Sequence, residues 1–259
     1  MLLGIVTDIH EDIVRLEESF ALFDARQVDE IVCLGDMVGF GVPFYSYLKT
    51  RNSNRVIKLI KGKCAVVVKG NHDLFHIRKT PVNIGQFHYP ENWYALDYQK
   101  RKEFSGDQIW LYEENDLYSL LTSENMKYID TLPEYEAKDC GRYKILFSHY
   151  AFPDPTGSLT KMIKRRSMDD LCGQFEMMRQ CGCLYAFSGH DHYQGIKAFT
   201  NDSVIEISFG EKYTLPNQPL WLHVAAAANG TNRNGVAIYD TNTREIEAIP
   251  LNSPPHIVT

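Results

Sequence analysis

The stretch AVVVKGNHD at residues 65–73 decides the fold, because a run of apolar residues leads directly into a Gly-Asn-His-Asp cluster. The valine-rich run is typical of a buried strand, and the polar cluster is typical of a loop that carries ligands. The same arrangement recurs four more times along the chain. The other apolar runs are residues 2–6, 31–34, 145–147 and 184–187, and the clusters after them are Asp8-Ile9-His10, Gly35-Asp36, Ser148-His149 and Gly189-His190-Asp191-His192.

Helical patterns separate the first three apolar runs. Ile13, Leu16, Phe20 and Phe23 recur on one face of a helix, and residues 43–61 are also expected to be helical. Strands that alternate with helices predict βαβ units and a parallel sheet. Since the carboxyl ends of parallel strands meet at one edge of a sheet, we expect the five clusters to lie together there.

The second half of the chain returns to regular patterns after an irregular stretch. Met126, Ile129 and Leu132 indicate a short helix, and residues 143–147 indicate the next strand. Four further elements are predicted: a helix capped by Ser167, and strands at residues 203–209, 236–239 and 245–251, the last two joined by a hairpin turn at residues 241–243.

Residues 75–118 show no helical or strand period, yet they carry 10 of the 31 aromatic residues of the chain. Aromatic richness argues against disorder, and connections of this length inside a domain are usually lids or binding loops. We predict a cap that packs beside the ligand clusters. The alternative is a structural insertion that only covers a sheet edge. The cap is expected to belong to a single domain over residues 1–259.

Composition excludes several classes of protein. The 259 residues are 44% hydrophobic and 23% charged, as in ordinary globular proteins, and no apolar run approaches the roughly 20 residues that span a bilayer. The net charge is −6, and the sequence shows no basic stripe that would bind long nucleic acid. The basic cluster at residues 161–166 is interpreted as a solvated helix end. Residues 2–6 are interpreted as a core strand rather than a signal peptide, which predicts a cytoplasmic protein with reduced cysteines.

The five clusters, in this order, resemble the pattern of the calcineurin-like metallophosphoesterase family, which is D-x-H, G-D, G-N-H-D/E, H and G-H-x-H. The sequence GDMVGFG at residues 35–41 resembles a small bacterial branch of that family. This branch includes phosphodiesterases and enzymes related to diadenosine-tetraphosphate hydrolases. The resemblance spans nearly the whole chain, and it implies an α/β fold, a four-layer α/β/β/α sandwich with two mixed sheets.

The resemblance also implies a role for each matched residue, with two divalent ions as cofactors. Mn is favoured, and Fe, Zn or Ni also suit oxygen and nitrogen ligands. Asp36 would bridge both ions, and His72 would stand beside them as the general acid. The first ion would be held by Asp8, His10 and His192, and the second by Asn71, His149 and His190.

A site of this composition suits phosphate esters. Two divalent ions and two ligand carboxylates leave a net charge of about +2, or about +1 with a hydroxide that bridges the metals. Such a hydroxide attacks phosphorus in line with the leaving oxygen, and the metals neutralise the developing charge. His72 could then protonate the leaving group.

Two departures from the family pattern narrow the substrate. Ser/Thr protein phosphatases carry an Asp-Arg pair soon after the G-D block, where this chain has Gly39 and Phe40. The Arg that grips a phosphomonoester and the Asp that supports the general-acid His are therefore missing from those positions. An Asn-Pro-Gly-Ser-like stretch is also replaced, here by residues 224–229.

Residues next to the clusters have smaller expected roles. Asp73 is interpreted as a support for its loop, Asp191 as a residue that binds no metal, and Glu11 and Asp12 as the start of a helix.

Other side chains are candidates for substrate contact. Tyr150 and Tyr193 each adjoin a ligand cluster. His76 could contact substrate or could be an exposed loop histidine. Three aromatic residues of the cap could stack a nucleobase or could form the small core of the cap itself: Trp93, Tyr94 and Trp110.

These observations predict a binuclear-metal phosphoesterase, with phosphodiesters favoured over other substrates. The alternatives are a phosphomonoesterase and a dinucleoside polyphosphate hydrolase of the same chemistry. A non-catalytic scaffold on the same fold is a further alternative, disfavoured because all seven ligands and His72 are present. We expect a small phosphate-ester or nucleotide-like substrate, no long nucleic acid and no membrane partner, and the oligomeric state stays open.

Overall fold

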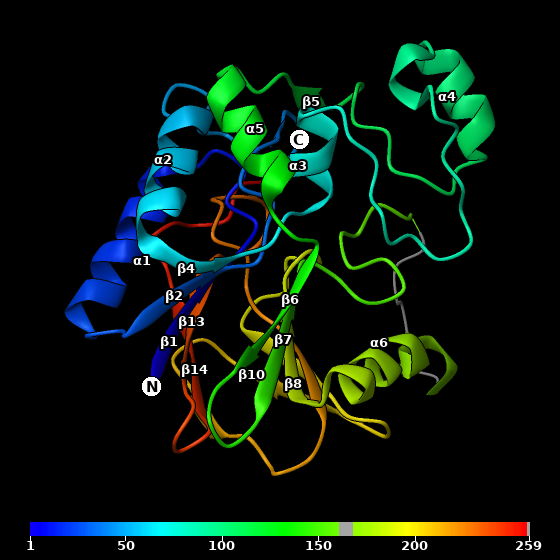
Figure 1. Cartoon of the computed structure of the whole chain (residues 1–259). Coiled ribbons are helices and arrows are strands. Elements are labelled where there is room, and N and C mark those ends of the chain that lie inside the picture. Colours follow the sequence, from blue (N-terminus) through cyan, green and yellow to red (C-terminus); the bar gives the residue numbers. More distant parts are fainter. Residues whose placement is uncertain (161–167, 258–259) are drawn as a thin grey trace.

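The computed structural model describes residues 1–160 and 168–257, in which two six-stranded mixed sheets are packed together (Figure 1). The first sheet has the order β11 (Lys212–Thr214), β14 (Glu245–Pro250), β13 (Gly235–Asp240), β1 (Leu2–Val6), β2 (Glu30–Cys33), β4 (Cys64–Val67). The second has the order β10 (Val204–Ile207), β9 (Ile196–Phe199), β12 (Leu220–His223), β8 (Cys183–Ser188), β7 (Lys144–Ser148), β6 (Tyr135–Asp139). Strands β1, β2 and β4 are parallel, and so are β7, β8 and β12.

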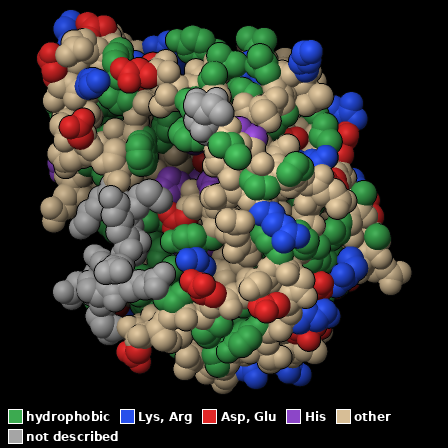
Figure 2. All heavy atoms as spheres, turned by 180° about the vertical axis from the view of Figure 1, so that it is seen from behind, with side chains coloured by type: hydrophobic (Ala, Val, Ile, Leu, Met, Phe, Trp, Pro, Cys, Tyr) green, Lys and Arg blue, Asp and Glu red, His purple; other side chains and the backbone are tan. Residues whose placement is uncertain are grey.

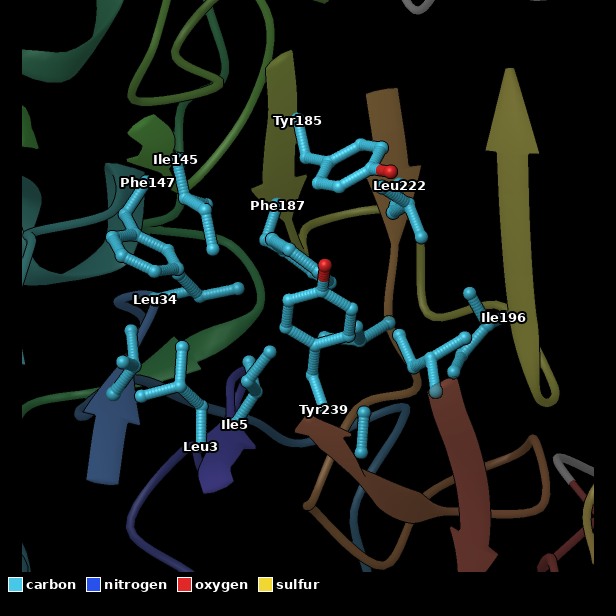
Figure 3. Close-up of a cluster of buried hydrophobic side chains, with 14 of the residues drawn as sticks. Leu3, Ile5, Leu34, Ile145, Phe147, Tyr185, Phe187, Ile196, Leu222 and Tyr239 are labelled. Atoms are coloured by element: carbon cyan, nitrogen blue, oxygen red, sulfur yellow. The ribbon is translucent and has the colours of Figure 1, made fainter. Parts of the chain in front are cut away.

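Alternation along the strands explains why both faces of each sheet are covered. Successive side chains of a strand point to opposite faces. In β1, Leu3 and Ile5 lie in the core between the sheets, whereas Val6 lies in the cluster on the outer face. In β7, Phe147 points into the same inner core, and Leu146 joins an outer cluster. Figure 3 shows the inner core, where Leu3 and Ile5 face side chains of the second sheet.

Helices complete the outer layers (Figure 1). Helices α1 (Ile13–Ala25), α2 (Ser53–Lys63) and α5 (Ser123–Thr131) contribute to the cluster outside the first sheet, and α6 (Met168–Cys181) packs against the second. The four residues predicted to form one helical face, Ile13, Leu16, Phe20 and Phe23, are all buried in α1. The predicted α/β/β/α sandwich with two mixed sheets is confirmed.

Some sequence predictions need correction. Residues 43–61 are not one helix: α2 begins only at Ser53, where Asn52 caps it by accepting the Arg55 N–H. Residues 43–52 are irregular because Tyr45 and Tyr47 instead pack around Phe40. Strands β6, β9, β11 and β12 were not predicted, and β10 ends earlier than the predicted strand at residues 203–209. The closing β13–β14 hairpin is confirmed.

Two sequence predictions fall on residues outside the described part of the chain. They are the Ser167 helix cap and the basic cluster at residues 161–166. Among the described residues, no helix is both long and apolar enough to cross a membrane.

The irregular stretch begins after the short helix α3 (Asn71–His76) and holds the 3-10 helix η1 (Trp93–Ala95), helix α4 (Tyr98–Ser105) and strand β5 (Asp116–Leu117). We call residues 77–117 the insertion. It has a hydrophobic cluster of its own, centred on Ile84, Trp93 and Ile109. Its last strand, β5, pairs antiparallel with β3 (Phe40–Gly41), which brings the end of the insertion next to the Gly35-Asp36 loop.

Candidate metal centre

The five clusters meet where the parallel strands end. Asp8 and His10 follow β1, and Asp36 follows β2. His149 directly follows β7 in the second sheet, so both sheets contribute to one site. Among the described residues, possible ligand atoms gather in four groups, each within 4.8 Å, and two of these groups match the predicted ligand sets: Asp8, His10 and His192, and Asp36, His149 and His190.

The first group surrounds the side chain of Asp8. His192 Nε2 lies 3.3 Å from Asp8 Oδ1, and His10 Nε2 lies 4.0 Å from the same oxygen. The two imidazole nitrogens are 3.3 Å apart. Three possible ligand atoms therefore converge on one small volume.

The second group surrounds Asp36. His149 Nε2 lies 3.1 Å from Asp36 Oδ2, and His190 Nδ1 lies 3.3 Å from His149 Nε2. Asn71 Oδ1 is 3.2 Å from the same His190 nitrogen. Asp36 Oδ2 also lies 3.8 Å from His10 Nε2, so Asp36 touches both groups. Its carboxylate thus lies between the two groups of candidate ligands.

Hydrogen bonds to the backbone orient two of the imidazole rings. His10 Nδ1 lies 2.9 Å from the Gly39 carbonyl oxygen, and His149 Nδ1 lies 2.8 Å from that of Leu34. A carbonyl oxygen can only accept, so each Nδ1 is the donor. In the neutral rings each Nε2 then points a lone pair into the site. Metal-binding histidines are usually held in this way.

The charges of the site also fit bound cations. Asp8 and Asp36 are buried, and within the described chain their ion pairs are with histidines alone. Burial acts to raise the pKa of Asp8, but His192 and His149 outweigh it and hold the pKa well below its usual range. Burial opposes the charge of His149 as well, yet Asp36 raises its pKa to about 10. Buried carboxylates of this kind require compensating positive charge, which a divalent ion supplies.

The backbone of the site is strained. Asp8, His10, Asp36, His190 and His192 have positive φ angles of 51°, 45°, 48°, 68° and 50°. Residues other than glycine adopt this left-handed region rarely, and such outliers cluster at functional sites.

Two glycines let the ligand loops approach closely. A Cβ atom at Gly70 would collide with the carboxylate of Asp36, and one at Gly189 would collide with that of Asp8. The Gly-Asn-His and Gly-His-Asp-His clusters therefore need glycine at their first position for steric reasons.

His72 has an acidic partner that sequence reasoning missed. Its Nδ1 lies 2.7 Å from Asp116 Oδ2, and its backbone N–H donates to Asp36 Oδ1 at 2.9 Å. Burial acts to lower the pKa of His72, but Asp116 and Asp36 raise it to about 9. The Asp that is missing near Gly39 is thus supplied by β5. No sequence signal identified it, because Asp116 belongs to no motif and lies 44 residues after His72.

Other side chains support the ligand loops. Asp73 Oδ1 accepts from the Met37 N–H at 2.9 Å, and its Oδ2 accepts from the Gly70 N–H at 3.0 Å, which confirms its predicted role. The Asn71 amide group donates to the Tyr112 hydroxyl. Because this hydrogen bond holds the amide nitrogen, the side-chain carbonyl oxygen of Asn71 is directed toward His190 and the other candidate metal ligands.

Of the two predictions for residues 11 and 12, one is confirmed and the other is wrong. Asp12 caps α1 by accepting from the Arg15 N–H at 3.1 Å, as expected. Glu11 does not start the helix: its buried carboxylate accepts from the Ser119 hydroxyl and lies 3.5 Å from Arg51. Glu11 therefore ties the end of β1 to the chain that follows the insertion.

The divergent segment at residues 224–229 joins the two sheets beside the site. Val224 donates to the Ser188 carbonyl at the end of β8. Ala227 and Ala228 donate to the carbonyls of Thr7 and Asp8 at 2.9 and 3.0 Å. All three side chains are buried, so small residues suit this crossing.

A cavity of about 400 Å³ opens over the candidate ligands. Figure 2 shows histidine side chains gathered in a hollow of the surface. The residues that line the cavity belong to the ligand loops, the insertion and two further loops: His10, Asp36, Gly41, Phe44, Tyr45, Asn71, His72, Trp110, Leu111, Tyr112, Asn115, Asp116, His190, His192, Gly230 and Thr231.

The candidates for substrate contact fall in different places. Tyr150 is buried with its ring centroid 4.5 Å from that of His190, and neither it nor Tyr193 lines the described cavity wall. His76 is not in an exposed loop: it lies in α3, its side chain is 2% exposed, and its Nε2 is 3.4 Å from Asp116 Oδ2. Trp110 lines the cavity, whereas Trp93 lies in the insertion's own cluster.

His223 was also missed. It ends β12, is buried, and places Nδ1 3.1 Å from Asp191 Oδ2. Asp191 thus faces a histidine of the neighbouring strand rather than the metal groups. The sequence signal was present, since His223 closes the apolar run at residues 220–223 and so ends a buried strand.

Comparisons with known proteins show which chains this one resembles. An uncharacterized protein of Methanocaldococcus jannaschii is 22% identical over 264 residues, which covers 96% of this chain and 86% of that protein. A metallophosphoesterase from Sphaerobacter thermophilus has a similar structure, with a TM-score of 0.64 and 20% identity over 98% of this chain and 89% of that one. A hypothetical protein from Pyrococcus horikoshii gives a TM-score of 0.59 with 11% identity over 98% and 88% of the two chains. The two structures establish the fold.

The family itself follows from the sequence. The family model for calcineurin-like phosphoesterases matches residues 1–194, which include all five clusters. Members of this family generally bind divalent metals, and the two groups of ligand atoms are candidate sites for them. The chain therefore belongs to the calcineurin-like phosphoesterase family and is a phosphoester hydrolase.

Proposed function

We propose that this protein is a phosphodiesterase that uses two divalent metal ions, with Mn as the favoured metal. One observation carries the proposal: Asp36 lies 3.1 Å from His149 and 3.8 Å from His10, so a single carboxylate adjoins both groups of ligands. A carboxylate with two oxygens can bridge ions at the roughly 3.5–4 Å spacing of two-metal sites. Asp8, His10 and His192 would hold one ion, and Asn71, His149 and His190 the other.

The residues of the chain divide the remaining work. Bound divalent ions supply Lewis acidity toward the phosphoryl oxygens and acidify the attacking water. His72, which lines the cavity, gives a proton to the leaving ester oxygen. Asp116 fixes the ring by accepting from His72 Nδ1, which leaves Nε2 to carry the transferred proton.

Charge favours a diester over the alternatives. Two divalent ions with Asp8 and Asp36 leave a net charge of about +2, or about +1 once a hydroxide nucleophile is counted, and the latter matches a singly charged diester. None of the described residues that line the cavity is Lys or Arg. A phosphomonoester or a dinucleoside polyphosphate carries further negative charge and would find no cationic side chain there. A scaffold function is disfavoured because the seven candidate ligands lie together, and five of them line one cavity with His72.

The cellular setting is part of the proposal. All six cysteines are free, which suits the reducing environment of a cytoplasm. We infer a small phosphate ester as the partner, with no role in binding long nucleic acid, because the chain carries a net charge of −6.

Hydrolysis of bis-p-nitrophenyl phosphate and p-nitrophenyl phosphate tests the function directly. Purified protein is assayed with added Mn²⁺ and with a chelator, and bound metal is quantified in the same samples. We expect metal-dependent turnover that is faster on the diester. Faster turnover of the monoester would overturn the diester preference, and protein with neither turnover nor bound metal would overturn the enzymatic proposal.

A further inference from the structure

The walls of the cavity over the ligand groups are aromatic, and two of these rings are exposed. Phe44 is 50% exposed and Trp110 is 40% exposed, although both line the same cavity. Large apolar side chains are normally buried, and a concave apolar surface beside polar groups marks a ligand site. A ligand that covers these two rings would remove apolar surface from water.

We propose that the cavity selects phosphodiesters that carry a planar, uncharged aromatic ring on one ester oxygen, with Phe44 and Trp110 as the residues that recognise the ring. This inference rests on the proposed phosphodiesterase function and names its class of substrate.

The position of the walls supports the proposal. Tyr45 lies against the ligand loops, with its ring centroid 5.0 Å from that of His10. Tyr112 lies with its ring centroid 4.2 Å from that of His72. Tyr45 and Tyr112 thus lie beside the ligand loops, which we call the floor of the cavity, and Phe44 and Trp110 line the same cavity. A phosphoryl group on the floor would therefore place its ester substituent between aromatic side chains.

The polar groups of the cavity also favour an uncharged ring. Beyond the ligand loops, the polar side chains of the described lining are Asn115, Asp116 and Thr231, together with the Tyr45 and Tyr112 hydroxyls. Asp116 is already paired with His72. Among the described lining residues outside the ligand loops there is thus no cationic side chain for a second phosphate and no unpaired carboxylate for a charged amine. An uncharged ring suits them best.

The rest of the insertion provides a contrast. Trp93 is 3% exposed and packs with Tyr89 and Phe87 in the insertion's own cluster. Exposure alone does not mark the wall, because Phe104 of the insertion is 51% exposed outside the cavity lining, whereas Trp110 is both exposed and part of that lining. Base–aromatic stacking is sequence-tolerant, because every base presents a flat face, so an aryl group and a nucleobase share the required chemistry.

Equilibrium binding tests the inference apart from turnover. Diphenylphosphinate and dimethylphosphinate are both singly charged, share one phosphinate group and contain no ester bond to hydrolyse. We expect calorimetric titration of the Mn²⁺-loaded protein to show diphenylphosphinate binding about tenfold more tightly. Trp110→Ala and Phe44→Ala should each lower that affinity about fivefold or more and leave dimethylphosphinate binding unchanged. Tyr118→Ala is the matched control, because Tyr118 is 77% exposed and does not line the cavity.

Equal affinities for the two phosphinates, or a preference that survives in both cavity variants, would overturn the inference. Turnover of bis-p-nitrophenyl phosphate is measured on the same samples. Turnover without a preference for diphenylphosphinate would rule out selection of an aromatic ring but would still support the phosphodiesterase function. A preference for diphenylphosphinate that depends on Trp110, without any turnover, would rule out the phosphodiesterase function but would still support a binding site for an aromatic ring.

A further assay separates the two sources of the ring. Thymidine 5′-(p-nitrophenyl) phosphate and bis-p-nitrophenyl phosphate share a leaving group and differ in the group that is retained. A higher kcat/KM for the thymidine ester that falls about tenfold in Trp110→Ala would assign the wall to nucleobases. A higher kcat/KM for the diaryl ester with the same dependence on Trp110 would assign it to simple aryl groups. Dependence on Trp110 in neither substrate would overturn ring recognition.

Discussion

The ligand edge and the insertion contribute to one cavity but are built in opposite ways. Every candidate metal ligand stands directly after a strand, or one to four residues beyond it, in two sheets with a continuous core between them. The insertion has only short elements and a small separate cluster around Trp93. Yet Trp110, Tyr112 and Asp116 reach the cavity from its last residues. Regular structure thus positions the candidate metal ligands, and irregular structure forms part of the cavity beside them.

The comparison suggests a division of labour that mutation can test. Loss of a side chain from the ligand edge should abolish chemistry, because the ions are held there. Loss of a side chain from the insertion should reduce the rate, the selectivity or the affinity for one metal ion, and excess metal should keep the site occupied. The expected effects decrease from the bridging ligand outward.

Asp36→Asn should cause the largest effect. The amide removes one negative charge and the second bridging oxygen between the two ligand groups. We expect turnover of bis-p-nitrophenyl phosphate to fall at least about a thousandfold, more than the loss of a single stabilising hydrogen bond costs. Metal content, measured by elemental analysis, should fall with it. Asp202→Asn is the control, since Asp202 is exposed. Retention of both ions and of turnover would contradict the bridging role.

His72→Gln should come second, with kcat lower by about 10²–10⁴-fold and the metal content retained. Since p-nitrophenolate leaves readily without a proton, the loss should be larger on diphenyl phosphate than on bis-p-nitrophenyl phosphate. His88→Gln changes an exposed histidine of the insertion and serves as the control. Equal losses on the two esters would argue against proton donation by His72.

Asp116→Asn should reduce kcat by about 10–100-fold, the usual cost of removing a partner that orients a catalytic group. The loss should show the same dependence on the leaving group as that of His72→Gln, and the double variant should be no slower than His72→Gln alone. Asp107→Asn, an exposed aspartate in the same insertion, should leave kcat unchanged. A double variant that is slower by the product of the two losses would show that Asp116 acts independently of His72.

Tyr112→Phe should have the smallest effect. It removes the hydroxyl that accepts from the Asn71 amide, so the carbonyl oxygen of Asn71 is less firmly directed. We expect about tenfold weaker binding of one metal ion, measured by titration of the metal-free protein. Excess Mn²⁺ should restore turnover, which it cannot do for Asp116→Asn. Unchanged metal affinity would show that Tyr112 lines the cavity without positioning Asn71.

The same contrast explains what the sequence could predict. Residues such as Asp8, Asp36 and His149 were brought together correctly because each ends a strand, and parallel strands share an edge. Five motifs in order then identified the family and the fold. Strand alternation is a local property of the chain, so the apolar runs identified those strands well. Strand β11 was not predicted because its three residues are all exposed and show no apolar pattern.

The insertion could not be predicted in the same way. Asp116 contacts His72 because β5 pairs with β3. Each of these strands has two residues, which is too short for a hydrophobic period in the sequence to predict the pairing. Trp93 and Trp110 are equivalent in sequence terms, and only tertiary packing buries one and exposes the other. His223 could have been found from its strand, whereas Glu11 was misassigned because an acidic residue before a helix usually caps it.

The pairing of His72 with Asp116 has a consequence for how such proteins diversify. The acid that orients the general-acid histidine lies in the same stretch of chain as the aromatic wall at Trp110. A recombination that exchanged residues 77–117 with those of a relative would replace the cavity wall and the acid together. If His72 is the general acid and Trp110 selects the substrate, as proposed, turnover and substrate choice depend on one segment of chain, and a grafted insertion without a carboxylate opposite His72 would change the preference at the expense of rate.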